Sequence, residues 1–160
     1  MSRVPWPAQI VIGAALAALL TALWMAALGW VVALGDSTAH RVYRQVYRQV
    51  SVTEPGAGPD WVRFTLAHPY LDTPRSVIKQ VVCRPGQTLV AGPQGDTCDG
   101  RVIARPKVRT LDGRPLTPFV WAGPVPAGRV FVANPHPDSF DSRYFGFVDL
   151  SKVDALEVVW

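Results

Sequence analysis

An uncharged stretch near the start of the chain constrains its structure more than any other feature. No Asp, Glu, Lys or Arg occurs in residues 4–35, and the core of the stretch, 10–34, consists of Ala, Leu, Val, Ile, Trp and Met with few polar interruptions. At 1.5 Å per residue, a helix of this length crosses a bilayer core of about 30 Å. Cleaved secretory signals have shorter apolar regions, about 7–15 residues. We therefore predict a retained transmembrane helix at 10–34, preceded by a short N-terminal segment at 1–9.

The rest of the chain has the pattern of a β domain. Most of the 15 prolines and 13 glycines lie beyond residue 54, which favours short strands and turns. The near-repeat at 42–50 fits either a helix face or a strand. Strands are predicted at 61–66, 77–82, 88–90, 102–104, 118–121, 128–133 and 155–160. No linker is long enough to separate a second domain, so we predict one mainly β domain at 35–160 after the single helix.

Two signals disagree about the side of the membrane on which this domain lies. Three arginines closely follow the apolar run and one precedes it, and this count alone would place the C-terminal side in the cytoplasm. Cys83 and Cys98, however, flank a Gly/Pro-rich loop that a disulfide would close. Closing a loop of about 15 residues is worth about 3 kcal/mol, and the bond persists only in an oxidising compartment. Because long domains translocate despite flanking charge, we place residues 35–160 in the periplasm and 1–9 in the cytoplasm.

One lysine stands inside an apolar strand, in the run VIKQVV at 77–82. Burial disfavours the charged ammonium and lowers the pKa of a lysine, and a neutral Lys79 could serve as a general base. The alternative is a lysine near the strand end whose head reaches water. The downstream run SFDSRYFG at 139–146 favours catalysis, since it places Asp141 and Arg143 close together beside hydroxyl groups.

These motifs resemble those of a known family. VIKQVV, followed by Pro85 and Gly86, resembles the lysine box of type I signal peptidases. VPAGRVFV at 125–132 and SFDSRYFG at 139–146 resemble their C-terminal box. GRPL at 113–116, with Phe140 and Phe145, is closer to the conjugative-transfer branch, the TraF-like peptidases that mature pilins. The resemblance covers the helix and nearly all of the outer domain.

The resemblance implies a signal-peptidase-like β domain with a Ser–Lys dyad. The branch's serine box looks like S-x-P-x-G-L-Y, and the best match is STAHRVY at 37–43. Ser37 and the tyrosine agree with the box, whereas Ala39 and Arg41 depart from it. Ser37 directly follows the apolar run and is the expected nucleophile, with Lys79 as its base. Ser51 is the rival serine, close to the strand at 61–66.

The remaining roles follow from the same resemblance. Ser139 would bond the lysine amine, Asp141 and Arg143 would form a supporting salt bridge, and the Ser37 N–H would contribute to an oxyanion hole. The substrate would be a preprotein or a pilin precursor, bound as an extended strand at the outer surface of a bacterial inner membrane. Water or an amine would resolve the acyl-enzyme, and an amine would cyclise a pilin. The conjugative transfer machinery would be a further partner.

Two alternatives remain beside a pilin peptidase. One is a general type I signal peptidase, and the other is an inactive pseudo-peptidase that binds pilin as a scaffold in a transfer assembly. No cofactor is expected, and the dispersed histidines do not indicate a metal site. The basic residues are scattered among acids, so we expect no nucleic-acid partner.

Overall fold

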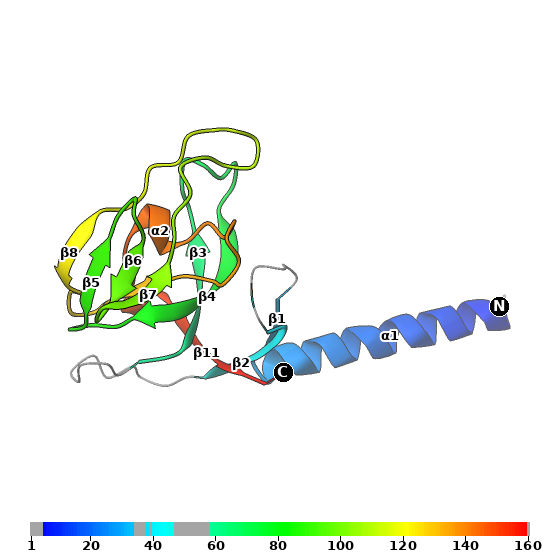
Figure 1. Ribbon diagram of the computed structural model, residues 1–160. Helices are drawn as coiled ribbons and strands as arrows, with labels where there is room; N and C mark the ends of the chain where they lie inside the picture. The colour runs from blue at the N-terminus through cyan, green and yellow to red at the C-terminus, as the bar shows by residue number, and fades with distance from the viewer. Residues whose placement is uncertain (1–4, 34–37, 39, 47–57, 160) are drawn as a thin grey trace.

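The computed structural model describes residues 5–33, 38, 40–46 and 58–159. It confirms a mainly β fold with one N-terminal apolar helix (Figure 1). The elements are α1 (Trp6–Ala27), β1 (Trp30–Val32), β2 (Val42–Val46), β3 (Trp61–Leu66), β4 (Arg75–Cys83), β5 (Thr88–Ala91), β6 (Asp96–Cys98), β7 (Arg101–Ala104), β8 (Trp121–Pro124), β9 (Arg129–Val132), α2 (Ser142–Phe145), β10 (Val148–Asp149), the 3-10 turn η1 (Leu150–Lys152) and β11 (Asp154–Val158).

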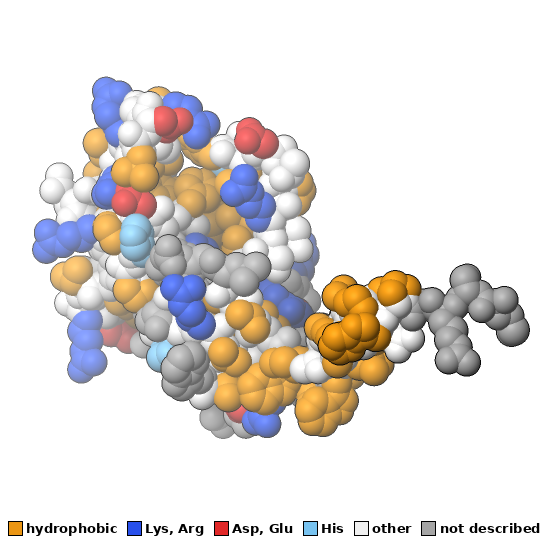
Figure 2. Space-filling model, turned by 90° about the vertical axis from the view of Figure 1, so that its right-hand side faces the viewer, with side chains coloured by type: hydrophobic (Ala, Val, Ile, Leu, Met, Phe, Trp, Pro, Cys, Tyr) orange, Lys and Arg blue, Asp and Glu red, His pale blue; other side chains and the backbone are white. Residues whose placement is uncertain are grey.

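Helix α1 projects away from the β body (Figure 1). None of its residues is buried, and Figure 2 shows hydrophobic side chains along the helix and where it joins the body. Its 22 residues span about 33 Å, and it is long and apolar enough to cross a membrane. The helix begins and ends earlier than the predicted 10–34. It ends there because Gly29, with φ of 72°, turns the chain into β1.

The larger sheet has the order β1-β2-β11-β3-β4-β9-β10 and contains the longest strand, β4. Strand β3 pairs with β4 from Trp61 to Leu66, with Val62 directly opposite Lys79. Side chains alternate between the two faces of a strand. Lys79 therefore shares a face with Val62, which belongs to a buried valine-rich core, while Trp61 packs on the opposite face.

The smaller sheet has the order β7-β6-β5-β8, and a disulfide joins it to the larger one. The bond links Cys83, the last residue of β4, to Cys98 in β6, with 5.7 Å between their Cα atoms. The predicted disulfide is confirmed. Both sulfurs are buried beside Leu89 and Phe131, so the bridge forms part of the core between the sheets.

Most predicted strands lie close to observed ones, and two segments are informative. In the ambiguous near-repeat, Val42–Val46 forms strand β2 between β1 and β11, and the residues after it lie outside the described part of the chain. The strand predicted at 118–121 is wrong except for its last residue, since β8 starts at Trp121. Phe119 N instead donates to the Arg143 carbonyl (2.8 Å), which attaches this segment to α2.

Candidate active site

Lys79 is buried in the middle of β4, with 5% of its surface exposed. Its Nζ donates a hydrogen bond to Ser139 Oγ at 2.7 Å. The side chain therefore does not reach water, and the alternative of a solvated lysine at a strand end is wrong. The contact brings together two of the predicted site residues, which lie 60 positions apart in the sequence.

Burial shifts the ionisation of this amine toward neutral pH. The pKa of Lys79 falls from 10.5 to about 8, chiefly because burial disfavours the charged form. The negative charge of Asp141 raises the pKa and the positive charge of Arg143 lowers it, each by less than burial does. A lysine with this pKa is partly neutral near pH 7–8, the state in which it can accept a proton.

A buried ion pair holds the loop that carries Ser139. Arg143 Nε and Nη2 bind the two carboxylate oxygens of Asp141, each at 2.7 Å, and both side chains are almost fully enclosed. Arg143 Nη2 also donates to the carbonyl of Ser139 (3.0 Å) and to that of His136 (3.2 Å). Asp141 caps the short helix α2 by accepting from Arg143 N. The pair therefore holds the backbone around Ser139, and its supporting role in catalysis stays a prediction.

Asn134 is a site residue that the sequence motifs did not reveal. Its Oδ1 accepts from Gln80 N (3.0 Å), and its Nδ2 donates to the Ile78 carbonyl (3.1 Å). These two backbone groups flank Lys79. The amide N–H of Asn134 donates to Asp141 Oδ2 (3.2 Å), so the residue connects the lysine strand to the ion pair. The available signal was its position between the strand at 128–133 and the serine motif.

One edge of β4 is open next to the lysine. Strand β9 pairs with β4 at Val81 and Cys83, and just after β9 Ala133 N donates to the Gln80 carbonyl (2.9 Å). The Asn134 side chain extends this contact as far as Ile78. Beyond Ile78, no other strand in the described part of the chain pairs with this edge. By alternation, the backbone groups of Ser76 point toward it. An extended polypeptide could hydrogen-bond there as an added strand.

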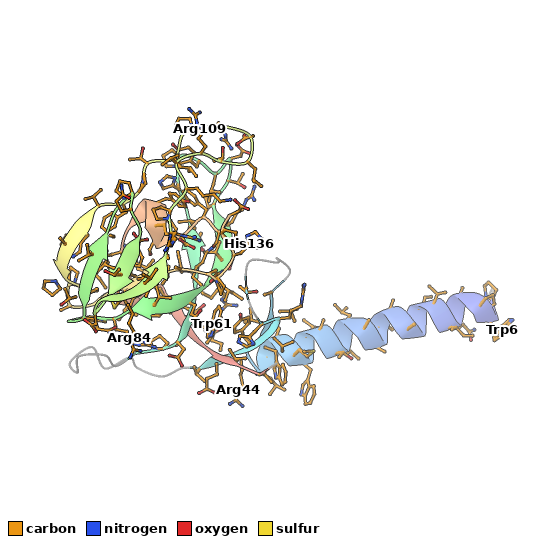
Figure 3. All side chains as sticks on the ribbon, viewed as in Figure 1. Trp6, Arg44, Trp61, Arg84, Arg109 and His136 are labelled. Atoms are coloured by element: carbon orange, nitrogen blue, oxygen red, sulfur yellow. A yellow bond between two sulfur atoms is a disulfide. The ribbon has the colours of Figure 1, made fainter. Side chains whose placement is uncertain are left out.

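The predicted nucleophile Ser37, its neighbours Gly35 and Ala39, and the rival Ser51 lie outside the described residues. The described residues around Ser37 are held near β3. Ala33 N donates to the Arg41 carbonyl (2.8 Å), and the His40 ring packs edge-on against Trp61 at 5.7 Å between centroids. Figure 3 shows Trp61 between the base of the helix and the body, with His136 higher on the same side.

Comparison with known proteins identifies the family. Residues 5–160 match the family model described as signal peptidase, peptidase S26. Because this match spans nearly the whole chain, the protein belongs to the peptidase S26 signal peptidase family. The family is one of serine peptidases and implies a preprotein substrate. A search of the curated proteins finds no significant match.

Proposed function

We propose that the protein is a membrane-anchored serine endopeptidase in which Ser37 is the nucleophile and Lys79 is its general base. The observation that carries the proposal is the buried amine of Lys79, bonded to Ser139 and shifted to a pKa of about 8. A fully charged surface lysine could not accept the serine proton at neutral pH. Membership of a serine peptidase family supports the same reaction class.

In the proposed reaction, neutral Lys79 takes the hydroxyl proton of Ser37 as the serine oxygen attacks the scissile carbonyl. The C–N bond then breaks, and the leaving amine receives the proton from the Lys79 ammonium, which leaves an ester on Ser37. Lys79 next takes a proton from water as the water oxygen attacks the ester, and it returns that proton to the Ser37 oxygen as the product acid leaves. The Ser37 N–H would stabilise the oxyanion. Ser139, Asp141 and Arg143 would hold the amine in place throughout.

The substrate would bind as a strand on the open edge of β4, alongside Ser76 and Ile78. The His40 end of the Ser37 segment packs on the Trp61 face of the sheet, whereas Lys79 points to the other face. The proposed dyad would therefore bring the Ser37 hydroxyl to the Lys79 face of the sheet.

We propose further that α1 anchors the protein in the inner membrane, with the β domain in the periplasm. Two observations support this arrangement, the unburied apolar helix and the disulfide, which an oxidising compartment maintains. The motifs at 113–116 and 139–146 favour a pilin precursor as substrate and the conjugative transfer machinery as partner. Attack on the acyl-enzyme by a pilin amine in place of water would give a cyclic product.

The test is cleavage of a candidate pilin precursor by the purified full-length protein, with product mass as the readout. We expect Ser37→Ala and Lys79→Ala each to abolish cleavage while the protein still accumulates, and Ser51→Ala to cleave normally. A product one water lighter than the free acid would indicate cyclisation. Retained cleavage in either dyad variant removes that residue from the dyad. A wild-type protein that binds precursors but cleaves none is the pseudo-peptidase scaffold.

A further inference from the structure

A cavity of about 290 Å³ lies beside the proposed active site, between the Ser139 loop and the segment at 107–116. Phe140 and Tyr144 line one side, and Leu111, Leu116 and Arg109 line the other. Figure 3 shows Arg109 at the top of the body, on the loop that projects there. This volume is at the lower end of the roughly 300–1,000 Å³ of pockets for whole small-molecule ligands, and it is large enough for one aromatic side chain.

The aromatic side of the cavity is continuous with the Ser139 loop. Phe140 directly follows Ser139, and its ring stacks on Tyr144, with 5.3 Å between centroids and 4° between planes. The other side of Phe140 meets the rings of His68 (4.9 Å) and Tyr70 (5.9 Å). Stacked and edge-on rings of this kind form a fixed apolar surface.

Hydrogen bonds hold the opposite wall against this surface. Lys107 N donates to Tyr144 Oη (2.9 Å), and Tyr70 Oη donates to the Pro115 carbonyl (2.6 Å). Lys107 also forms an ion pair with Asp138. Both ends of the segment are therefore tied to the body, and the cavity exists before any ligand enters.

On the rim of the cavity, one cation has no acidic partner among the residues that the structure describes. Lys107 is paired with Asp138, and Asp112 is bound by Arg114 at 2.8 Å. Arg109 donates only to the Gly113 carbonyl (3.1 Å), and no carboxylate of the described residues pairs with it. An apolar side chain next to an acidic one would complement both the cavity and this rim.

The open edge of β4 leads from Lys79 to this cavity. Arg75, the first residue of β4, pairs with Leu66 at the end of β3. Two and four residues after Leu66, His68 and Tyr70 contact the Phe140 ring. At about 3.3 Å per residue, the four steps from Lys79 to Arg75 cover about 13 Å. A strand bound along this edge therefore reaches the Phe140 ring about four to six residues from the scissile bond.

We propose that this cavity is a specificity subsite for the polypeptide substrate. It takes a large aromatic or aliphatic side chain about four to six residues from the scissile bond, with an acidic neighbour against Arg109. The inference rests on the proposed peptidase function and adds a selectivity that the dyad itself does not provide.

The test uses full-length protein in detergent and peptides with Ala-X-Ala before the cut, in which one Phe is moved through each position. We expect one position in this range to raise kcat/KM about tenfold over Ala through a lower KM, as burial of an aromatic ring predicts. Leu116→Asp should abolish that preference and leave cleavage of the all-Ala peptide unchanged. The exposed Val102 provides the control, since Val102→Asp should retain the preference.

The charge on the rim has its own test. For a peptide with Glu beside the Phe, Arg109→Glu should lower kcat/KM about threefold to fivefold, the effect of one exposed ion pair. Replacing that Glu of the peptide by Lys should restore the kcat/KM of the Arg109→Glu variant. Arg101→Glu, on β7, should change neither value. Normal cleavage with no positional preference would overturn the subsite and leave the dyad standing. If no peptide is cleaved, peptides with benzoylphenylalanine in place of Phe are photocrosslinked to the protein instead. Crosslinks to residues outside 107–116 and 140–144 would overturn the subsite.

Discussion

Replacing Lys79 by Met should stabilise the protein at neutral pH while abolishing its activity. The pKa of Lys79 falls from the ordinary 10.5 to about 8 in the folded protein. At 1.36 kcal/mol per pKa unit, burial of the charged amine therefore destabilises the folded state by about 3 kcal/mol. Met removes that charge from the apolar core. Loss of the hydrogen bond to Ser139 offsets about 1 kcal/mol. The net gain at pH 7 should be about 2 kcal/mol.

The pH dependence identifies the cause of this gain. Well below pH 8 the amine is almost fully charged in both states, so almost the whole cost is present. Between about 8 and 10.5 the folded state loses its proton first, so wild-type stability rises with pH. With the same loss of the Ser139 hydrogen bond, the advantage of Lys79→Met should therefore shrink to about zero at pH 10.

The measurement is unfolding of the full-length protein in detergent, followed by tryptophan fluorescence at pH 7 and pH 10. About 2 kcal/mol corresponds to a rise in Tm of about 4–8 °C for a protein of this size. Lys152→Met, at an exposed position in η1, is the control and should change Tm little at either pH. A Lys79→Met protein that is less stable than wild type at pH 7, or whose gain is the same at both pH values, would refute the reasoning.

Four further predictions follow from the same contacts. The kcat/KM of the wild type should rise with pH to a plateau, with an apparent pKa near 8 from Lys79, and a flat profile from pH 6 to 9 would contradict the proposed role of Lys79 as base. Asp96 is buried, its Oδ2 has no hydrogen-bond partner in the described part of the chain, and its pKa is raised to about 6, mainly by burial. Asp96→Asn should therefore stabilise the fold by at most about 3 kcal/mol in urea unfolding at pH 8, and not at pH 3. Asp141→Asn leaves a buried guanidinium without its anion and should cost about 3–5 kcal/mol, with unchanged stability as the contrary result. Gly146 has φ of 75°, and a Cβ there would lie 2.7 Å from the Phe119 ring, so Gly146→Ala should lower stability by about 2–4 kcal/mol in the same assay.

The parts of the site that are local in sequence could be predicted, and the parts that depend on packing could not. Lys79 was recognisable because a single charged side chain inside an apolar strand must either reach water or be buried with a specific partner. Asp141 and Arg143 were recognisable because they lie in one short motif. Asn134 acts through two backbone groups on a different strand, and no local pattern encodes that contact. The end of the helix was equally hidden, because residues 30–32 continue the apolar run and become a strand only by pairing with β2.

The sequence after β9 explains how the edge of β4 stays open. Ala133 N already donates to the Gln80 carbonyl (2.9 Å). If a strand continued past this contact, its backbone would pair next with Ile78, and no polypeptide could add there. Pro135 prevents this because it has no N–H to donate and disfavours a central strand. Asn134, directly before it, satisfies the two groups beside Lys79 with its side chain in place of a strand. Strand β9 can thus end before the Ser139 loop. Lys79 is then buried and also lies next to the open edge of β4.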